Sequence, residues 1–589
     1  MTSMSIYILC KENVRVFFTM ASIVSRVVDD LADHHIDTYF LVTGGAIAPF
    51  VDAVGLSKRV KYYCFQHEQA AAMAAEGYYR ACGKIGVVLV TSGPGAQNII
   101  NGICGCWYDS IPCLFITGQV NVKESLESIQ SKPRQVGFQE MPVVSMVSDC
   151  TKFAIKIRQS SEVACVFSDA LKSMTHDRMG PAVIDFPVNI QMDLAPDDFQ
   201  IKFTPYVEPD VHVTDNVREM IANSKRPLVI IGNGARSVKA ELIQWLNVPF
   251  VTSWAAVDMI SHDHPLRAGS HGVYGDRVAN YAVQNADLLV ILGSRMDTRQ
   301  TGGNLGMCSR ESKRIMVDVD VEEISKLNER GFTVHAPLIG SVSSFIRQMQ
   351  LQTPQEWVET LQKWKTEFGT ETTREGNVYP FLSGIKLPEE CIIIPDTGGN
   401  LIWTIQSMKL NGTQRLFTNL GNSSMGWSLP AAIGAAIGTE GKVPVVCIKG
   451  DGGIQMNIQE LRTLASLNLP VTVIVLNNQG YGIIRQFQDS YFKSRYTATS
   501  SDDVFGVPDG MDFVAIANAY GIKAFKSLEV VVSSLQPVLY DAPIDSTQRI
   551  FPKLEFGNSL ENMTPYRNEL HEYMIVPPVK PNAPSGWVK

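Results

Sequence analysis

Two glycine-rich turns in the last third of the sequence each follow a short apolar run. Val445–Ile448 leads into Gly450–Gly453, and Val471–Leu476 ends in Asn477–Gly480. A helical pattern over residues 457–467 lies between them, which predicts a strand–helix–strand unit. Because the carboxyl ends of parallel strands meet at one edge of a sheet, where α/β proteins bind ligands, we expect the two turns to lie close together.

The side chains in these turns are suited to a magnesium–diphosphate site. Mg²⁺ prefers hard oxygen ligands in an octahedron and commonly keeps phosphate oxygens in its shell. Asp451, the side chain of Asn478 and the backbone carbonyl of Gly480 would supply three ligands, and phosphate oxygens and water the rest. Gly452 and Gly453 would let backbone N–H groups approach the phosphates at a helix N-terminus. Either turn alone is common in ordinary proteins, but both at this spacing favour the functional interpretation.

The elements that would position these turns indicate an α/β protein with three doubly wound parallel-sheet domains. The predicted domains are residues 20–192, 208–350 and 376–545, followed by a proline-rich tail, 546–589, that we expect to wrap the surface. The segments 193–210 and 352–380 read as linkers, the second with an amphipathic helical piece. The predicted strands are Tyr39–Val42, Val87–Val90, Leu114–Thr117, Val183–Phe186, Leu228–Ile231, Leu288–Leu292, Ile315–Val319, Ile392–Pro395, Val445–Ile448, Val471–Leu476 and Val538–Tyr540.

Composition excludes several classes of protein. A chain of 589 residues is too long for one core, and 45% hydrophobic with 19% charged residues is an ordinary globular balance. A net charge of −8 without a basic run argues against nucleic-acid binding. The 11 cysteines form no C-x-x-C pair, which favours reduced thiols in the cytoplasm. No apolar run reaches the ~18 residues of a membrane span, and residues 1–19 do not resemble a signal peptide.

The Gly-Asp-Gly turn with an asparagine 27 residues after its aspartate resembles the signature of thiamine diphosphate (ThDP)-dependent enzymes. The resemblance covers nearly the whole chain and is strongest to the acetolactate synthase (acetohydroxyacid synthase) group. It implies three domains: an N-terminal pyrimidine-binding, a middle and a C-terminal diphosphate-binding domain. The similar segments, in order, are His67–Gln69, Ala71–Gly77, Thr91–Gly95, Phe138–Glu140, Thr151–Lys152, Gly180–Ala182, Met425–Gly426, Leu429–Gly434 and Gln455–Leu461.

The resemblance assigns roles residue by residue. Glu68, contributed by a partner subunit, would share a proton with the cofactor's aminopyrimidine so that the reactive carbon of the thiazolium loses its proton. Met425 would support the bent cofactor. The other implied cofactor contacts are Pro94, Gly399, Asn400, Tyr481, Gly482 and Ile483. The active assembly would be a homodimer or a dimer of dimers that shares its sites between subunits.

The implied reaction decarboxylates pyruvate and transfers the two-carbon enamine to a second 2-keto acid, giving 2-acetolactate, as in branched-chain amino acid biosynthesis. Pyruvate decarboxylases carry a histidine pair after the first glycine turn, whereas Cys106–Ser110 contains none, which favours a carboligase over simple decarboxylation. Phe138, Gln139 and Lys152 match the acceptor side. A non-catalytic relative should have lost Glu68, Asp451 or Asn478, and all three are present.

The identity of the acceptor stays open. Phe487 stands where branched-chain enzymes have a tryptophan that favours 2-ketobutyrate. The tail resembles enzymes of surface-polysaccharide and branched-sugar synthesis, so a keto-sugar is the alternative acceptor.

A flavin in the middle domain also stays open. The turn at Gly232–Gly234 lacks the last glycine of a dinucleotide fingerprint. Gly232, Arg295 and Asp320 nevertheless match the FAD-holding segments of acetolactate synthases, some of whose relatives bind no flavin.

Overall fold

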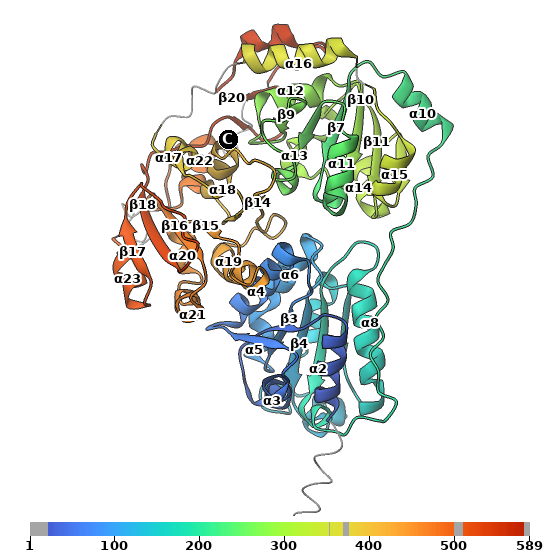
Figure 1. The fold of residues 1–589 in the computed structure, drawn as a ribbon, viewed down its shortest axis with the longest axis vertical. Coiled ribbons are helices and arrows are strands. Elements are labelled where there is room, and N and C mark those ends of the chain that lie inside the picture. The colour runs from blue at the N-terminus through green and yellow to red at the C-terminus, as the bar shows by residue number, and fades with distance from the viewer. Residues whose placement is uncertain (1–21, 353, 369–375, 500–509, 582–589) are drawn as a thin grey trace, which may run out of the picture. The chain divides into compact units, whose positions relative to one another are not determined.

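The computed structural model describes residues 22–352, 354–368, 376–499 and 510–581 (Figure 1). The expected domain start at Met20 and the extension before it lie outside the described residues. The chain forms two compact units that do not follow chain order. The first comprises the chain up to Tyr206 with Asn419–Lys442 and Asn457–Val471, and the second comprises the remainder. None of the helices in the described part of the chain is both long and apolar enough to cross a membrane.

The first unit contains a six-stranded parallel sheet in the order β2-β1-β3-β4-β6-β5. Its strands are β1 (Thr38–Leu41), β2 (Lys61–Cys64), β3 (Val87–Val90), β4 (Leu114–Gln119), β5 (Phe153–Lys156) and β6 (Ala182–Pro187). The helices of this segment are α2 (Ile23–Asp33), α3 (Ala48–Leu56), α4 (Glu68–Cys82), α5 (Pro94–Asn98), α6 (Ile100–Tyr108), α7 (Val143–Val147), α8 (Val163–Thr175) and α9 (Val188–Gln191). All side chains of β1, β3, β4 and β6 are buried, as expected of a sheet covered on both faces.

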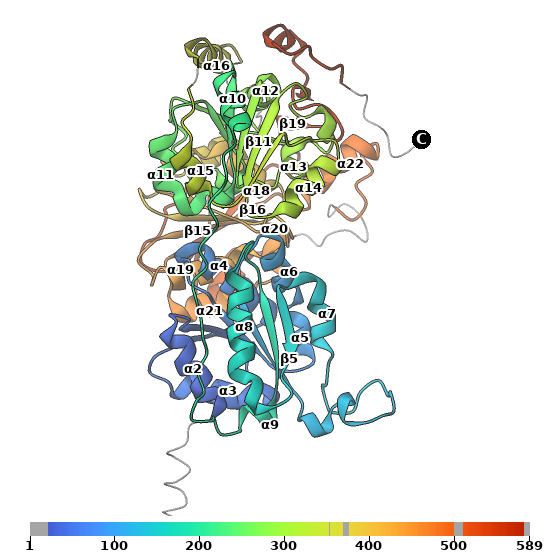
Figure 2. The same ribbon diagram turned by 90° about the vertical axis from the view of Figure 1, so that its right-hand side faces the viewer.

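Two helices from the last third of the chain belong to this first unit: α19 (Ser428–Gly438) and α21 (Glu460–Leu467). Figures 1 and 2 show α19 beside α4. Glycines permit this close packing, because a Cβ at Gly77 would lie 2.2 Å from the Ala431 carbonyl oxygen, and one at Gly434 would lie 1.9 Å from that of Ala74. The two backbones therefore touch where α4 leads away from Glu68.

The second unit contains two further six-stranded parallel sheets. The central sheet, in the order β12-β11-β10-β7-β8-β9, consists of β7 (Pro227–Ile231), β8 (Phe250–Thr252), β9 (Arg267–Ser270), β10 (Leu288–Leu292), β11 (Lys313–Asp318) and β12 (Ala336–Ile339). Its helices are α10 (Asp215–Ala222), α11 (Lys239–Trp245), α12 (Arg277–Asn285), α13 (Thr298–Thr301), α14 (Val321–Glu329) and α15 (Val342–Gln348). Two hydrophobic clusters bury the two faces of this sheet.

The last sheet has the order β14-β13-β15-β16-β18-β17 and contains both predicted glycine-rich turns. Its strands are β13 (Ile392–Pro395), β14 (Arg415–Leu416), β15 (Val445–Gly450), β16 (Val471–Asn477), β17 (Lys523–Lys526) and β18 (Val538–Pro543). The helices of the second unit in this region are α17 (Val378–Gly384), α18 (Gly399–Ser407), α20 (Asp451–Gln455), α22 (Gly482–Tyr491) and α23 (Phe513–Ala519). Because β15 and β16 are neighbours, the turns that follow them share one edge. The expected fold, parallel sheets flanked by helices, is confirmed.

The amphipathic piece of the second linker is a helix, as predicted, whereas the tail packs more deeply than predicted. The amphipathic piece is helix α16 (Gln355–Glu367), which buries Trp357, Leu361 and Trp364. The tail forms a two-stranded ribbon, β19 (Lys553–Leu554) with β20 (Met563–Thr564), and its apolar side chains enter the same core cluster. The expectation that the tail merely wraps the surface was therefore wrong.

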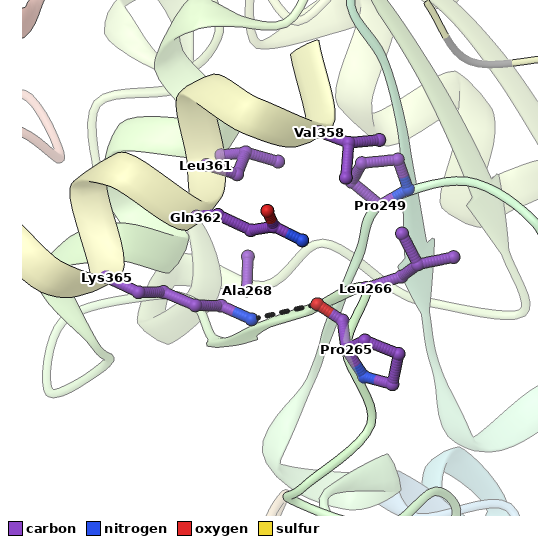
Figure 3. Close-up of a pocket in the computed structure, with 8 residues that line it drawn as sticks. All are labelled: Pro249, Pro265, Leu266, Ala268, Val358, Leu361, Gln362 and Lys365. Atoms are coloured by element: carbon purple, nitrogen blue, oxygen red, sulfur yellow. Dashed lines mark hydrogen bonds between the residues drawn. The ribbon is translucent and has the colours of Figure 1, made fainter. Parts of the chain in front are cut away.

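A pocket lies under α16, where Lys365 donates a hydrogen bond to the Pro265 carbonyl at 3.1 Å (Figure 3). It is lined by Pro249, Pro265, Leu266, Ala268, Val358, Leu361, Gln362 and Lys365. Its volume of about 10 Å³ is that of a single water position, too small for an organic ligand. None of the predicted site residues lines it.

Candidate functional site

In the second unit, the turns after β15 and β16 meet through Asp451. Its Oδ2 accepts the N–H of Gly480 at 2.9 Å, and its Oδ1 accepts the N–H of Gly452 at 3.0 Å. Asn478, on the same turn as Gly480, is 5% exposed. The structure thus brings the three predicted metal ligands to one edge of the sheet. Their set of a carboxylate, an amide and a backbone carbonyl fits Mg²⁺, which takes oxygen ligands.

Because the Asp451 carboxylate is largely buried, a bound cation would stabilise its charged form. Removal from water raises the pKa of Asp451 to about 6, and the hydrogen bonds from Gly480 and Gly452 only partly offset this. Ionising a carboxyl with that pKa, rather than with the ordinary 3.8, costs about 3 kcal/mol. A divalent cation would recover this cost, which is the second reason that these residues fit a metal.

Glycines near Asp451 let neighbouring groups pack against the two turns more closely than a side chain would allow. A side chain at Gly452 would place its Cβ 2.3 Å from the ring of Tyr481, the residue that precedes α22. Gly480 has φ +149°, and a Cβ there would lie 2.5 Å from the Thr499 carbonyl oxygen. Gly453, Gly482 and Ile483 fall in the first turns of α20 and α22, whose N-termini favour an anion.

Gly399 and Asn400 are the first residues of α18, which follows the turn after β13 at this edge. Asn400 is 5% exposed and donates to the Thr397 carbonyl at 2.8 Å, while its Oδ1 has no hydrogen-bond partner among the described residues. A Cβ at Gly450 would lie 3.8 Å from the Asn400 amide nitrogen, so this turn touches the Gly450–Gly453 turn. An unpaired buried amide oxygen is costly and fits a site that a polar group or a hydrated metal completes.

Glu68 belongs to the first unit, where it is the first residue of α4. It is half-buried, and its Oε2 accepts the side-chain N–H of Asn98 at 2.9 Å. A Cβ at Gly95 would lie 3.6 Å from Glu68 Oε1, so the Gly93–Pro94–Gly95 turn packs against the carboxylate. Gly93 has φ +59°, and a Cβ there would lie 2.9 Å from the Cβ of Gln139. Glu68, Pro94 and Gln139 are therefore brought together.

Three further predicted residues lie in the first unit: Phe138 and Lys152, predicted for the acceptor side, and Met425, predicted to support the cofactor. Phe138 is 85% exposed. Lys152 donates to the carbonyls of Arg178 at 3.0 Å and His176 at 3.3 Å, so its ammonium group is held by backbone in this chain. Met425 is half-buried, and the carbonyl of its neighbour Gly426 accepts from Asn457 at 3.1 Å.

Phe487 lies on α22 in the second unit and is 46% exposed. Its ring centroid is 4.7 Å from that of Tyr491. The Tyr491 hydroxyl donates to Glu555 of the tail at 3.2 Å, and Glu555 forms an ion pair with Lys553 at 2.8 Å. The Lys553–Glu555 ion pair, which has no net charge, is therefore linked to Phe487 through the side chain of Tyr491.

In the central sheet, the three residues predicted to hold a flavin have local structural roles. A Cβ at Gly232 would lie 2.0 Å from the Gly293 carbonyl oxygen, so glycine there permits contact between two turns. Arg295 forms an ion pair with Glu323 at 3.1 Å, and Asp320 caps α14 by accepting the N–H of Glu322 at 2.9 Å.

Two buried side chains, after β8 and β9, carry polar atoms without a hydrogen-bond partner among the described residues. Both ring nitrogens of His271 and the indole N–H of Trp254 have no hydrogen-bond partner within the described ranges, although His271 is 1% and Trp254 8% exposed. Burial lowers the pKa of His271 to about 4, so its imidazole is neutral. Trp254 follows β8, the neighbour of β7, and His271 follows β9, the next strand, so both lie at the carboxyl edge where Gly232 lies, and they fit a cofactor with hydrogen-bonding ring atoms.

Sequence reasoning missed two groups near the predicted sites. Asn98, which holds Glu68, follows the recognised glycine turn by a few residues and could have been found from that spacing. Glu460, in the recognised segment Gln455–Leu461, is 0% exposed and accepts the N–H of Gln66 at 3.1 Å. The sequence signal for Glu460 was a glutamate at helical spacing from the apolar residues Leu464 and Leu467.

Comparison with known families places all three sheets in one kind of enzyme. Residues 22–177 match the model of the N-terminal TPP binding domain of thiamine pyrophosphate enzymes, and residues 214–349 match the central domain of the same enzymes. Residues 396–549 match their C-terminal TPP binding domain. The chain therefore belongs to the thiamine pyrophosphate (thiamine diphosphate) enzyme family.

Within this family the chain is similar to acetolactate synthases. It is 32% identical over 561 residues to the acetolactate synthase isozyme 2 large subunit of Escherichia coli (strain K12), covering 91% of this chain and 98% of that subunit. The large subunit of Cyanidium caldarium is 30% identical over 574 residues, with 91% and 95% covered. That of Parasynechococcus marenigrum (strain WH8102) is 31% identical over 583 residues, with 92% and 90% covered. The resemblance inferred from the motifs is thereby confirmed.

Proposed function

We propose that this protein, a thiamine diphosphate-dependent carboligase of the acetolactate synthase type, uses Mg²⁺ at Asp451 to hold its cofactor and transfers the two-carbon unit of pyruvate to a second 2-keto acid. The observation that carries the proposal is the contact of Asp451 with the Gly480 turn at 2.9 Å. That contact supports the proposal because it joins a largely buried carboxylate to the turn that carries Asn478 and Gly480, at the carboxyl edge of the sheet.

The diphosphate end of the site is assigned to the second unit. Asp451, Asn478 and the Gly480 carbonyl would bind the metal, and Gly452 and Gly453 would hold the phosphates. Gly399, Asn400, Tyr481, Gly482 and Ile483 complete the contacts. When bound, ThDP supplies a carbon nucleophile and an electron sink for the loss of CO₂.

Glu68 is assigned the proton transfer that activates the cofactor. A carboxyl group next to the aminopyrimidine can give and accept a proton, and such positioned acid–base groups contribute about 10²–10⁴-fold to rate. Asn98 fixes one carboxylate oxygen at 2.9 Å and so orients the other toward the Gly95 turn. Pro94 makes that turn rigid, and Met425 is assigned the support of the bent cofactor.

The acceptor side is assigned to Gln139, Phe138, Lys152 and Phe487. A second acceptor class, a keto-sugar, is favoured by one observation: the Lys553–Glu555 ion pair and the Tyr491 hydroxyl beside Phe487 offer hydrogen bonds without net charge. A neutral polar wall suits the hydroxyl groups of a sugar better than the carboxylate of a keto acid.

The remaining assignments follow from the resemblance. We assign three domains at residues 20–192, 208–350 and 376–545, and a homodimer or dimer of dimers in which Glu68 of one subunit serves the metal site of another. FAD is assigned to Gly232, Arg295 and Asp320, with the unpaired nitrogens of His271 and Trp254 as further support. The ten described cysteines are free, in keeping with a cytoplasmic protein.

Product analysis tests the proposed reaction. Purified protein with ThDP, Mg²⁺ and pyruvate should form 2-acetolactate, identified by NMR, and the addition of keto-sugars shows whether they compete for the two-carbon unit. Release of acetaldehyde with no ligation product would contradict the carboligase proposal. The Asp451→Ala variant is the control for background decarboxylation.

A further inference from the structure

The segment that precedes Glu68 is held by a buried carboxylate from a distant part of the chain. Glu460, the first residue of α21, is 0% exposed. Its Oε1 accepts the N–H of Gln66 at 3.1 Å, its Oε2 lies 3.4 Å from the same nitrogen, and the N–H of His67 also donates to the carboxylate. The hydroxyl of Thr463 donates to Oε2 at 2.7 Å. Gln66 and His67 directly precede Glu68.

This arrangement exceeds what the stability of a helix start requires. His67 already caps α4, because its Nδ1 accepts the N–H of Gln69 at 3.1 Å. Glu460 instead fixes the two residues before the helix, and so the direction in which the chain enters Glu68. Because hydrogen bonds from N–H groups to a carboxylate are roughly twice as strong as neutral ones, the charge on Glu460 sets how firmly this segment is held.

We infer that Glu460 is a positioning residue, which holds the Gln66–His67 segment so that Glu68 points at the cofactor's aminopyrimidine. The inference rests on the role of Glu68 in the proposed function. In this role Glu460 acts through the backbone in front of Glu68.

The strength with which Glu460 holds the Gln66–His67 segment depends on pH. Burial raises the pKa of Glu460 to about 7, and the hydrogen bonds from Thr463, Gln66 and His67 oppose the rise. The ionisable residues at the start of α4 are its N-cap, His67, and Glu68; α19 carries none, and Arg462 on the helix of Glu460 is exposed. The carboxylate form, which holds the N–H groups strongly, is therefore present above pH 7 and lost as the pH falls through 7.

A first experiment needs no cofactor. Hydrogen–deuterium exchange of the backbone amides of Gln66 and His67, corrected for intrinsic exchange, should show protection above pH 7 that falls below it in the parent. Glu460→Gln should lose this pH dependence, because the amide keeps no charge and offers an N–H toward the donors. Ser466→Ala, an exposed position on the same helix, should behave as the parent. Equal protection of these amides at all pH values in the parent would overturn the inference.

A second experiment follows exchange of the C2 proton of bound ThDP. Glu460→Gln should slow it about 10-fold to 100-fold, the effect expected of a misaimed group, with ThDP affinity nearly unchanged. Thr463→Val removes a hydrogen bond that favours the charged form, so the acid limb of the exchange rate should move to higher pH. Parent-like pH profiles in both variants would overturn the inference.

Glu68→Gln separates the two proposals. If it slows C2 exchange at every pH while Glu460→Gln has no effect, Glu460 is not a positioning residue but Glu68 keeps its role. If the C2 proton exchanges as fast in Glu68→Gln as in the parent, the proposed role of Glu68 fails. Protection of the Gln66 and His67 amides then tests by itself whether Glu460 holds this segment. Thermal unfolding of each variant identifies loss of the fold, in which case Thr463→Val and the parent's own pH dependence decide whether Glu460 acts as inferred.

Discussion

Asp451 and Gly480 are joined by a hydrogen bond of 2.9 Å between a carboxylate oxygen and a backbone N–H, across two neighbouring parallel strands. The residues are far apart along the chain, and one strand–helix–strand unit brings them together. The same carboxylate is largely buried, which disfavours its charge until a cation arrives. The burial of this charged group and the placement of Glu68 and Phe487 lead to predictions that experiments can test.

Removing the charge of Asp451 should stabilise the cofactor-free protein. In Asp451→Asn the amide oxygen can still accept from Gly480. The hydrogen bond from Gly452, worth about 1 kcal/mol, is lost, but so is the cost of the buried charge, about 3 kcal/mol. Because the folded-state pKa is raised to about 6, the parent loses this stability as the pH rises from about 4 to 6. Denaturant unfolding of both proteins without Mg²⁺ should therefore agree near pH 4 and differ at pH 7. A less stable variant at pH 7 would refute the idea that Asp451 is strained without metal.

Glu68→Gln should bind ThDP almost as the parent does but lose most activation of the cofactor. The amide can keep the hydrogen bond to Asn98, yet it cannot share a proton with the aminopyrimidine. We expect the rate of hydrogen–deuterium exchange at C2 to fall about 10²–10⁴-fold. Asn98→Asp is a useful comparison, since it removes the donor that holds Glu68 but keeps the Glu68 carboxyl group, so exchange should slow less than in Glu68→Gln.

Purified protein should be yellow and release FAD on denaturation if the middle domain binds flavin. His271→Phe and Trp254→Phe remove the unpaired nitrogens and should weaken flavin retention, measured by absorbance after desalting. A colourless preparation that takes up no FAD on incubation would remove the flavin assignment.

Phe487→Trp should alter the choice of acceptor. Tryptophan is larger and adds an indole N–H, so the half-exposed wall on α22 should become narrower and more polar. Selection for one methylene is worth only ~1–3 kcal/mol in an apolar pocket. The parent should barely distinguish 2-ketobutyrate from pyruvate, and the variant should prefer 2-ketobutyrate while slowing bulkier acceptors. A competition assay decides this: a strong preference in the parent that the substitution leaves unchanged would show that Phe487 is not the specificity position.

Most interior strands could be predicted from the sequence because they are continuous apolar runs, and Val87–Val90, Leu288–Leu292 and Ile392–Pro395 match the observed bounds. Edge strands could not. Lys61–Cys64 is largely exposed and carries no hydrophobic pattern, so only its pairing with β1 makes it a strand. Similarly, β14 and β19 are two-residue strands that tertiary contacts define.

The site was predictable where its chemistry is local and unpredictable where packing creates it. The Gly-Asp-Gly sequence indicates both a tight turn and a carboxylate suited to bind a metal, so Asp451 could be predicted as a site residue. By contrast, Glu460 gains its environment only when α21 packs beside the segment before α4, and its bond to Gln66 joins residues 394 positions apart. The burial of tail residues such as Leu560 in the central core likewise depends on long-range packing.

Calorimetric titration of ThDP with and without Mg²⁺ tests the central claim most directly. The parent should bind ThDP tightly only when Mg²⁺ is present. Asp451→Ala should lose about 3 kcal/mol of binding free energy, about 100-fold in Kd, because the diphosphate loses its bridge to the protein. An affinity for ThDP that is the same in the parent and in Asp451→Ala, and indifferent to Mg²⁺, would contradict the assignment of the metal site.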